Sequence, residues 1–369
     1  MLLTQAFDYT KMIAVMTPRE NLLRSLRRQG FETVPVAAGG FCPSQVEAFE
    51  KRFGHRNVAD WFGDPYRGIW VSLQQTYSDG RALYKRESLP EDTHIDPWGV
   101  GHSRRPGCWH MTRMHHPLKG EDVSLDEIRN YPMPVQAPDT AAKIGAMTAE
   151  IHGQNLASFG HQPCSVWETA WYIRSMEDLM TDMLDEDERA RVLLDAVTDI
   201  SCQRSATFAA AGCDIIELGD DIGMQHSIMM SVELWRTWLK PRLKRVIDAA
   251  RERKPDVLIF YHSCGYIIPF LEELIEIGVD ILNPVQPECM DFEEVYRLTG
   301  GRLSYWGTVG TQKLLPFGTP QEIRADIHRK LRICGEKGGI LISPTHLVEP
   351  EVPWENLVAM RDAAREFVL

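Results

Sequence analysis

From about residue 138 onward, short apolar runs alternate with longer stretches in which apolar residues recur at spacings of three and four. The runs predict strands and the stretches predict helices. Strand and helix alternation with short loops is typical of parallel βα units with right-handed crossovers. It allows an open doubly wound sheet or a closed (β/α)8 barrel. Since no Gly-x-Gly-x-x-Gly follows a predicted strand here, a dinucleotide-binding sheet is disfavoured and we expect the barrel.

The rest of the chain has a different pattern. Thr17, Pro18 and Gly30 predict the cap, first position and end of a helix over 17–30, and residues 32–38 predict a strand. Residues 60–135 are rich in Trp, Pro, Gly and His with weak periodicity, which predicts loops and short hairpins. We therefore expect one α/β domain over 1–369, a (β/α)8 TIM barrel whose regular units span 136–369, with an N-terminal elaboration over 1–135.

Within the regular part, each apolar run and each amphipathic stretch predicts one element. The predicted strands are 213–219, 257–261, 279–282, 303–306 and 340–343. The predicted helices are 140–159, 174–182, 187–211, 231–253, 267–277, 292–299, 320–336 and 353–367.

Charge and composition exclude several functions. The chain has 40 Lys+Arg against 52 Asp+Glu, a formal net charge of -12, and no basic tract, so no nucleic-acid partner is expected. Its apolar runs are too short to cross a bilayer, and the first residues lack the pattern of a signal peptide. The 8 cysteines are scattered, which predicts reduced cytosolic thiols in place of a disulfide framework.

Polar side chains follow the predicted strands, and in a barrel the carboxyl ends of the strands meet at one mouth. Taken strand by strand, these residues are Glu217, Asp220 and Asp221; His262 and Cys264; Asn283 and Gln286; Trp306 and Gln312; and Thr345 and His346. We expect them to form the active site, with Glu217, Asn283, Gln286 and Trp306 binding substrate.

His262-Ser-Cys264-Gly265 carries the sharpest chemical signal. Side chains two apart at the end of a strand point to the same side, and imidazole and thiolate are both ligands for zinc. Two ligands do not make a site, and His346 at another strand end is the candidate for the third. The fourth position falls to Glu217, Asp220, Asp221 or Gln286, or stays open for substrate or water. The alternatives are a His and a Cys packed beside a βα turn, and a loop histidine at 346.

Asp220 and Asp221 are adjacent carboxylates, so mutual repulsion is expected to raise the pKa of one and suit it to proton transfer. The alternatives are that both hydrogen-bond basic groups, or that one of them caps the next helix. We assign His110, His115 and His116 to the irregular loops and not to a metal site. Several tryptophans are candidates either for an apolar pocket around a flat ligand or for core packing: Trp98, Trp109, Trp167, Trp171 and Trp306.

The sequence resembles the uroporphyrinogen decarboxylase superfamily over nearly its whole length. The segments that carry the resemblance are Thr17-Pro-Arg-Glu-Asn21, Asp96-Pro-Trp-Gly99, His116-Pro-Leu118, Gly219-Asp-Asp-Ile-Gly-Met-Gln225, Tyr261-His-Ser-Cys-Gly265, Asp280-Ile-Leu-Asn-Pro-Val-Gln286, Tyr305-Trp-Gly307 and Val352-Pro-Trp-Glu-Asn356. The resemblance implies a (β/α)8 barrel. Residues 33–42 lack the arginines that bind porphyrinogen carboxylates in the true decarboxylases, so that substrate is not expected.

His262-x-Cys264 resembles the zinc motif of the corrinoid-dependent methyltransferase branch. Where the coenzyme M members have Ser-Pro-Gly-Cys, this chain has Ser343-Pro-Thr-His346, so histidine replaces the second cysteine. The resemblance implies that Zn²⁺ polarises a methylated heteroatom and that the methyl group moves to the Co(I) corrinoid (cobalamin) of a partner protein. Asp220 or Asp221 would position the substrate or deliver a proton to it. A methoxylated aromatic, giving O-demethylation, is the first substrate expected.

Two other functions remain open at this stage. One is a metal-assisted decarboxylase or lyase of the same fold that acts on a small acid. The other is a corrinoid- or tetrapyrrole-binding protein without catalytic activity. A cytoplasmic location follows from the resemblance, and a homo-oligomer is possible.

Overall fold

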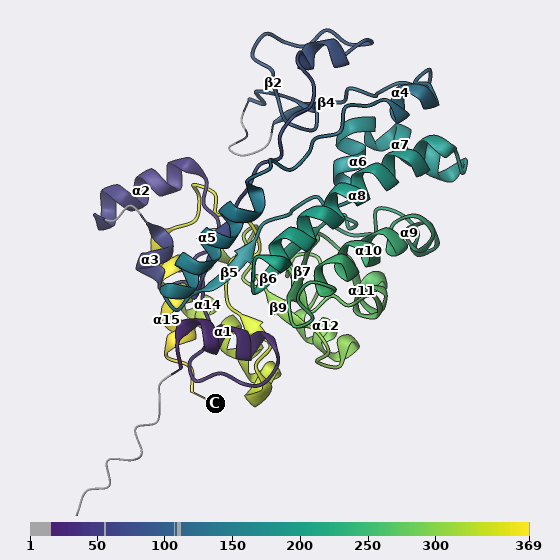
Figure 1. The fold of residues 1–369 in the computed structure, drawn as a ribbon. Coiled ribbons are helices and arrows are strands. Elements are labelled where there is room, and N and C mark those ends of the chain that lie inside the picture. The colour runs from purple at the N-terminus through teal and green to yellow at the C-terminus, as the bar shows by residue number, and fades with distance from the viewer. Residues whose placement is uncertain (1–15, 55–56, 107, 109–111, 369) are drawn as a thin grey trace, which may run out of the picture.

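The structure is a computed structural model that describes residues 16–54, 57–106, 108 and 112–368. Within these residues, seven parallel strands form one curled sheet in chain order (Figure 1). The strands are β1 (Tyr66–Ile69), β5 (Ala157–Gly160), β6 (Ile215–Gly219), β7 (Leu258–His262), β8 (Ile281–Asn283), β9 (Ser304–Trp306) and β10 (Ile340–Leu341). Trp109 and His110 lie outside the described residues.

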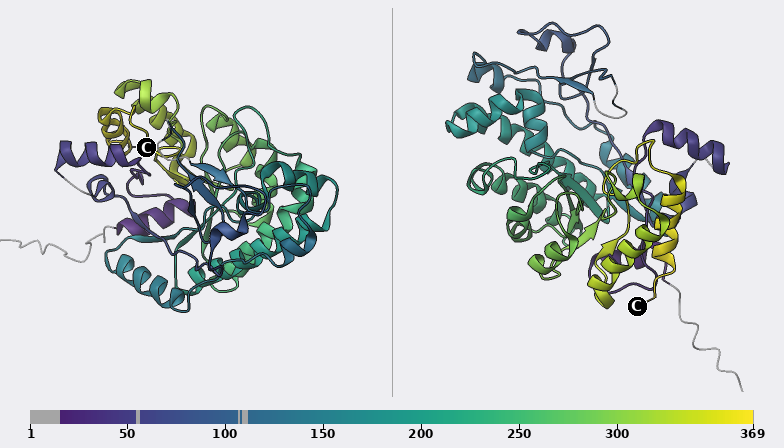
Figure 2. Two further views of the ribbon diagram at one scale, coloured as in Figure 1. Left: turned by 90° about the horizontal axis from the view of Figure 1, so that it is seen from above. Right: turned by 180° about the vertical axis from the view of Figure 1, so that it is seen from behind.

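Helices alternate with these strands and cover the outer face of the sheet. They are α5 (Thr140–Gly153), α6 (Trp167–Arg174), α7 (Met176–Leu184), α8 (Glu188–Ala210), α9 (Val232–Trp238), α10 (Lys240–Arg251), η2 (Ile268–Phe270), α11 (Leu271–Ile277), α12 (Phe292–Thr299), α13 (Leu314–Phe317), α14 (Pro320–Cys334), η3 (Gly335–Lys337) and α15 (Trp354–Arg365). The N-terminal helices α1 (Pro18–Leu26), α2 (Pro43–Phe53) and α3 (Val58–Phe62) lie on the same side as α14 and α15 (Figures 1 and 2). No helix of the described chain is long and apolar enough to cross a membrane.

The eighth strand position is taken by a short segment before α2. Pro35 O accepts from Ile342 N, and Ala37 N donates to Ile342 O, both at 2.9 Å, so the segment pairs in parallel beside β10. The strand predicted over 32–38 is reduced to this single bridge, because Pro35 has no N–H to extend the ladder. On the other side Ala38 N donates to the Asp64 carboxylate at 2.9 Å, just before β1. The predicted (β/α)8-type barrel is confirmed.

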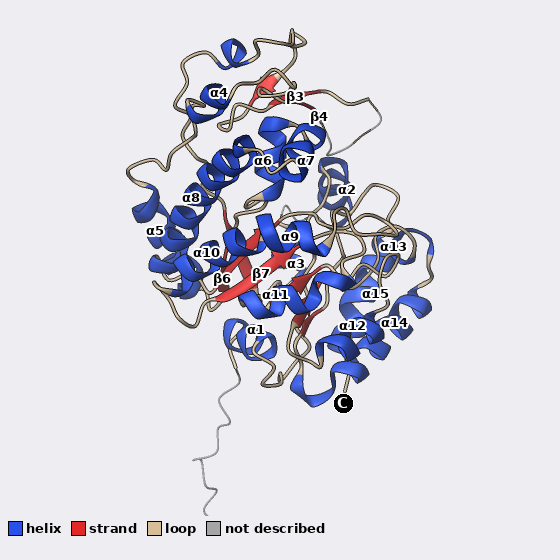
Figure 3. Ribbon diagram, turned by 90° about the vertical axis from the view of Figure 1, so that its right-hand side faces the viewer, coloured by secondary structure: helices blue, strands red, loops and turns tan. Residues whose placement is uncertain are grey.

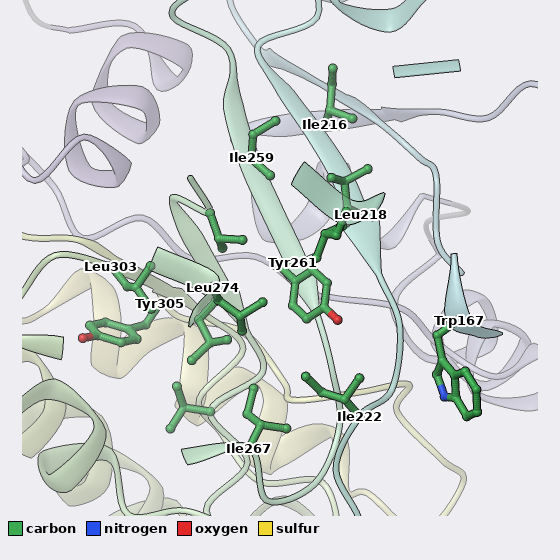
Figure 4. Close-up of a cluster of buried hydrophobic side chains, with 14 of the residues drawn as sticks. Trp167, Ile216, Leu218, Ile222, Ile259, Tyr261, Ile267, Leu274, Leu303 and Tyr305 are labelled. Atoms are coloured by element: carbon green, nitrogen blue, oxygen red, sulfur yellow. The ribbon is translucent and has the colours of Figure 1, made fainter. Parts of the chain in front are cut away.

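Side-chain alternation along the strands creates two apolar layers. Inward-facing residues such as Ile215, Phe260 and Trp306 pack on one another inside the barrel. Outward-facing residues such as Ile216 and Tyr261 pack beneath the helices, as Figure 4 shows for the β6 and β7 region. The inner layer therefore fills the barrel below the strand ends and leaves the mouth to polar residues.

The elaboration is an insertion in the first βα connection. Residues 70–139 leave the carboxyl end of β1 and return at α5, with Gln74 and Val135 paired at the base of the insertion. It holds η1 (Gly80–Leu83), α4 (Leu125–Arg129) and an antiparallel sheet of β2 (His94–Ile95), β3 (Gly101–Ser103) and β4 (Arg113–His115). Figure 3 shows it above α6 and α7. The predicted loops and hairpins are confirmed, but β1 and the 35–37 bridge, inside the segment expected to be an elaboration, belong to the barrel.

Two predicted helices end early or are divided, and one helix was not predicted. The helix expected over 140–159 ends at Gly153, and its last predicted residues form β5, since Asn155 takes a left-handed φ of 58°. Pro241 near the start of α10 separates that helix from α9 within the segment expected to be one helix over 231–253. In both cases, apolar spacing continues across a local break in the backbone. The helix expected over 174–182 matches α7, and α6, which ends just before Ser175, was not predicted.

Asp64 provides a test of barrel closure. Burial raises its carboxyl pKa to about 7, against the opposing effects of the Ala38 N–H and Arg67. Between the unfolded pKa near 3.9 and pH 7 the folded state keeps a proton that the unfolded state has lost, so the associated stability falls as pH rises. Asp64→Asn keeps the acceptor and removes the charge. We expect it to match the wild type near pH 4 and to be more stable by about 4 kcal/mol at pH 8.

Urea unfolding of both proteins from pH 4 to 8 measures this difference. A difference that is constant with pH, or a less stable variant at pH 8, would contradict the assignment of a raised pKa to Asp64.

Candidate metal centre at the barrel mouth

His262 is oriented by the neighbouring strand. The parallel register places His262 beside Asn283, whose Oδ1 lies 2.5 Å from His262 Nδ1. The Asn283 amide nitrogen donates to the Trp306 carbonyl at 2.7 Å, which fixes Oδ1 as the atom facing the imidazole. An Oδ1 acceptor requires a proton on Nδ1. The other ring nitrogen, Nε2, therefore points into the mouth and lies 3.4 Å from Cys264 Sγ.

The turn that carries Cys264 donates hydrogen bonds to side chains from the loops after β6 and β8. The backbone N of Cys264 donates to Asp221 Oδ1 at 2.7 Å, and the next residue, Gly265, donates to Gln286 Oε1 at 3.1 Å. Gly265 has φ 86°, and a Cβ there would lie 2.7 Å from backbone atoms of Gly223 and Met224, so only glycine fits. The turn after β7 thus fixes where the thiol points.

His346 completes a group of three potential metal ligands. The ligand atoms of His262, Cys264 and His346 all lie within 4.8 Å of one another, with the two imidazole centroids 6.0 Å apart. His346 follows β10, which β8 and β9 separate from β7 in the sheet. The curvature of the barrel, and not sheet adjacency, brings these residues together. Thr345 N, which donates to Val309 O at 2.9 Å, anchors the loop that carries His346.

The surroundings of His262 favour its protonated imidazole beside the Cys264 sulfur. Burial lowers the pKa of His262, but the Cys264 sulfur, the Asp221 carboxylate and Asn283 outweigh it and raise that pKa to about 10. Asp221 Oδ1 lies 3.8 Å from His262 Nε2. A metal ion at this position would therefore take the place of a proton between the two side chains.

An open cavity of about 510 Å³ adjoins the group. Its lining residues come from the loops after β6 to β10: Gly223, Met224, Gln225, Cys264, Gly265, Pro284, Gln286, Thr311, Gln312, Thr345, His346, Leu347, Glu349 and Glu351. The described lining includes no Trp, Tyr or Phe, so this cavity gives no support to the aromatic pocket, one of the two alternatives for the tryptophans. Trp167 and Trp306 are buried instead, Trp306 among Tyr66, Phe159 and Phe260 inside the barrel.

The adjacent carboxylates have separate surroundings. Asp220 is buried and accepts from the backbone N–H groups of Val166 and Glu168, at 3.1 and 2.8 Å, so it caps the start of α6. Burial, with the nearby Glu168 charge, raises its pKa well above the usual range. Asp221 lies beside the candidate ligands, and its side chain is 36% exposed. The pKa expected to be raised by repulsion between the two is raised instead by burial and Glu168, and the helix that Asp220 caps is the preceding α6 and not the next one.

Glu217 and Gln286 also lie at strand ends, with different partners. Glu217 Oε2 is 2.7 Å from His161 Nδ1, and the exposed Trp70 stacks on that imidazole at 3.8 Å. Gln286 lines the cavity and holds the Gly265 turn. His115 and His116, as expected, serve the inserted loops, His115 contacting Ser103 and Glu87 and His116 contacting the Tyr172 carbonyl.

Two polar residues of the mouth are not predicted from the sequence. His161 follows β5, a segment that the apolar spacing predicts as helix, so the sequence does not place His161 at a strand end. Glu168 lies in the first turn of α6. Its carboxylate accepts hydrogen bonds from the Tyr172 hydroxyl at 2.7 Å and from Asp221 N at 3.0 Å. Burial, and then repulsion from Asp221, raises the pKa of Glu168. A carboxylate two residues after Val166 gives no sequence signal unless the helix start is known.

The sequence pattern of the uroporphyrinogen decarboxylase (URO-D) family matches residues 118–367, so the chain belongs to that family.

The chain is similar to members with two different activities. A methylated-thiol–coenzyme M methyltransferase of Methanosarcina mazei is 26% identical over 202 residues, which cover 53% of this chain and 50% of that protein. A uroporphyrinogen decarboxylase of Pseudomonas fluorescens is 24% identical over 364 residues, covering 94% of this chain and 96% of that protein. The solved structure of a methyltransferase from Methanosarcina mazei superposes with a TM-score of 0.65 at 19% identity, over 95% of this chain and 99% of that one, which supports the fold.

We expect the Asp220 carboxylate to stabilise the folded protein. Asp220→Ala removes the acceptor from the buried N–H groups of Val166 and Glu168, and we expect it to lower the free energy of unfolding by about 3 kcal/mol. Asp220→Asn retains one acceptor oxygen and should lose about half as much. Urea denaturation of the three proteins measures the losses. An Asp220→Ala protein as stable as the wild type would contradict the capping role.

Proposed function

We propose that this protein is a zinc-dependent methyltransferase that moves a methyl group from a small methylated substrate to the Co(I) corrinoid of a partner protein. The observation that carries the proposal is the convergence of His262, Cys264 and His346 within 4.8 Å at the edge of an open cavity. The similarity to a Methanosarcina mazei methylated-thiol–coenzyme M methyltransferase supports methyl transfer as the chemistry.

The three side chains fit zinc by their chemistry. One thiolate and two imidazoles are a ligand set that zinc accepts, and three protein ligands leave the fourth position to substrate, as in catalytic zinc sites. The hydrogen bond from His262 Nδ1 to Asn283 is the outer contact that ligating histidines commonly make, and it leaves Nε2 for the metal. Bound zinc would act as a Lewis acid on the heteroatom that carries the methyl group.

The chain's own residues account for orientation. Gln286 and Asp221 hold the β7 turn, so the thiol and imidazole stay in place as a substrate enters. Asp221 is the residue we propose to position the substrate, because it lies beside the candidate ligands, whereas Asp220 is occupied with the start of α6. Glu168, bound to Asp221 N, sets the position of that carboxylate.

The substrate class expected from the sequence needs refinement. A methoxylated aromatic has no aromatic side chain to stack on among the described lining residues, although Trp70 presents an exposed ring at the carboxyl end of β1. We therefore propose a small methylated donor and treat methoxyarenes as one arm of the test. In the decarboxylase alternative the metal would bind one carboxylate of a small acid, and the described lining offers no Lys or Arg for a second one.

The direct experiment combines metal content with methyl transfer. His262→Ala with Cys264→Ala should reduce bound zinc from about one ion per chain to a small fraction and abolish methyl transfer to a reduced corrinoid, since the thiolate and one imidazole are lost. Cys202→Ala, at a partly buried thiol on α8, is the matched control and should keep both. Mass-spectrometric metal analysis and the corrinoid absorbance change are the measurements.

Retention of zinc and of methyl transfer in the double variant would overturn the proposal. Carbon dioxide release from a small acid by the wild type, without methyl transfer from any methylated ether, thiol or amine, would favour the decarboxylase.

Asn283 offers a second test because it orients His262 and does not itself bind the metal. Asn283→Ala frees the His262 ring, and we expect zinc affinity to fall about 10- to 100-fold. Asn283→Asp keeps the acceptor and should restore most of the affinity. Competition with a chromophoric chelator measures both. Equal affinity in Asn283→Ala and the wild type would show that His262 is not oriented through Nδ1.

A further inference from the structure

Apart from the candidate ligands, the ionisable side chains in the described lining of the cavity are all acidic. The described lining contains two carboxylates, Glu349 and Glu351, both on the loop after β10, and no lysine or arginine. Glu351 is exposed, so its charge faces both the cavity opening and solvent. Asp221, which accepts from Cys264 N, is not itself a lining residue of this cavity.

Two lysines of the chain between β9 and β10 do not line the cavity. Lys313 follows the lining residue Gln312 but does not itself line the cavity. Lys330 is buried, donates to the Thr308 carbonyl and pairs with Asp326. No cationic side chain of the described lining is therefore available to hold a carboxylate, sulfonate or phosphate on a ligand.

The remaining polar groups of the lining are neutral. Gln225 and Gln312 exchange hydrogen bonds across the cavity, Nε2 of each donating to Oε1 of the other at 3.2 and 3.4 Å. They come from the loops after β6 and β9, and Gln286 and Thr345 lie nearby in the lining. Amide and hydroxyl groups can bind an ether, a hydroxyl or an ammonium group without a counter-charge.

We propose that this site selects its ligand by the charge of the end that does not react: cationic ends bind best, uncharged ends next and anionic ends worst. This inference rests on the proposed function, because it supposes that the reacting heteroatom sits at the His262, Cys264 and His346 group. It separates this chain from a site built for coenzyme M, a thiol that ends in a sulfonate.

Three thiols with the same two-carbon chain isolate the effect of the end group. Cysteamine ends in an ammonium, 2-mercaptoethanol in a hydroxyl and coenzyme M in a sulfonate. With Co²⁺ loaded in place of zinc, the visible spectrum reports the metal-bound thiolate of Cys264 and its change as a thiol binds. Titrations at one pH and moderate salt give three dissociation constants without any catalytic assay.

We expect coenzyme M to bind about tenfold more weakly than cysteamine to the wild type, since like charges near a partly exposed site repel modestly. Glu351→Lys reverses one charge, so coenzyme M should bind about as tightly as cysteamine, or more tightly. Because the intrinsic properties of each thiol are the same in both proteins, the change in ratio reports the protein alone. Glu252→Lys, an exposed change at the C-terminal end of α10, is the matched control and should leave the ratio unchanged.

Coenzyme M binding as tightly as cysteamine to the wild type, or a ratio that Glu351→Lys leaves unchanged, would overturn the inference while the proposed function stands. If the wild type gives no cysteine-to-Co²⁺ absorption, the metal centre itself is wrong, and the proposed function fails with it.

Discussion

The hydrogen bond between His262 Nδ1 and Asn283 Oδ1 is the contact on which the site depends. It exists because β7 and β8 are parallel neighbours in a register that pairs these two residues. Asn283 is fixed in turn by the Trp306 carbonyl of β9, so three consecutive strands determine the direction of one imidazole. Rigid strands, more than mobile loops, therefore set the position of the first candidate ligand.

Barrel closure supplies the rest of the group. His346 follows the last strand, and it reaches His262 and Cys264 because the sheet curls until β10 meets the 35–37 segment and Asp64 links that segment to β1. The apolar inner layer around Phe260 and Trp306 fills the barrel below. Polar chemistry is thus confined to the mouth, where the cavity opens and where the inserted residues 70–139 also emerge.

Sequence periodicity predicted the parallel barrel and most of its elements because strands such as β7 and helices such as α8 are locally regular. It failed at β5, where Asn155 adopts a left-handed φ value that apolar spacing does not record, and it did not predict α6. His262 and Cys264 were predictable as a pair from strand alternation. The separate surroundings of Asp220 and Asp221 were not, because the start of α6, which Asp220 caps, lies more than fifty residues away in the sequence.

In the proposed function, one sulfur and two imidazoles of this chain bind zinc at the barrel mouth. X-ray absorption at the zinc edge of the loaded protein measures these ligands. We expect one sulfur scatterer at about 2.3 Å, two imidazole nitrogens at about 2.0–2.1 Å and one further light atom. A zinc shell without sulfur, or with two or more sulfurs, would contradict this expectation.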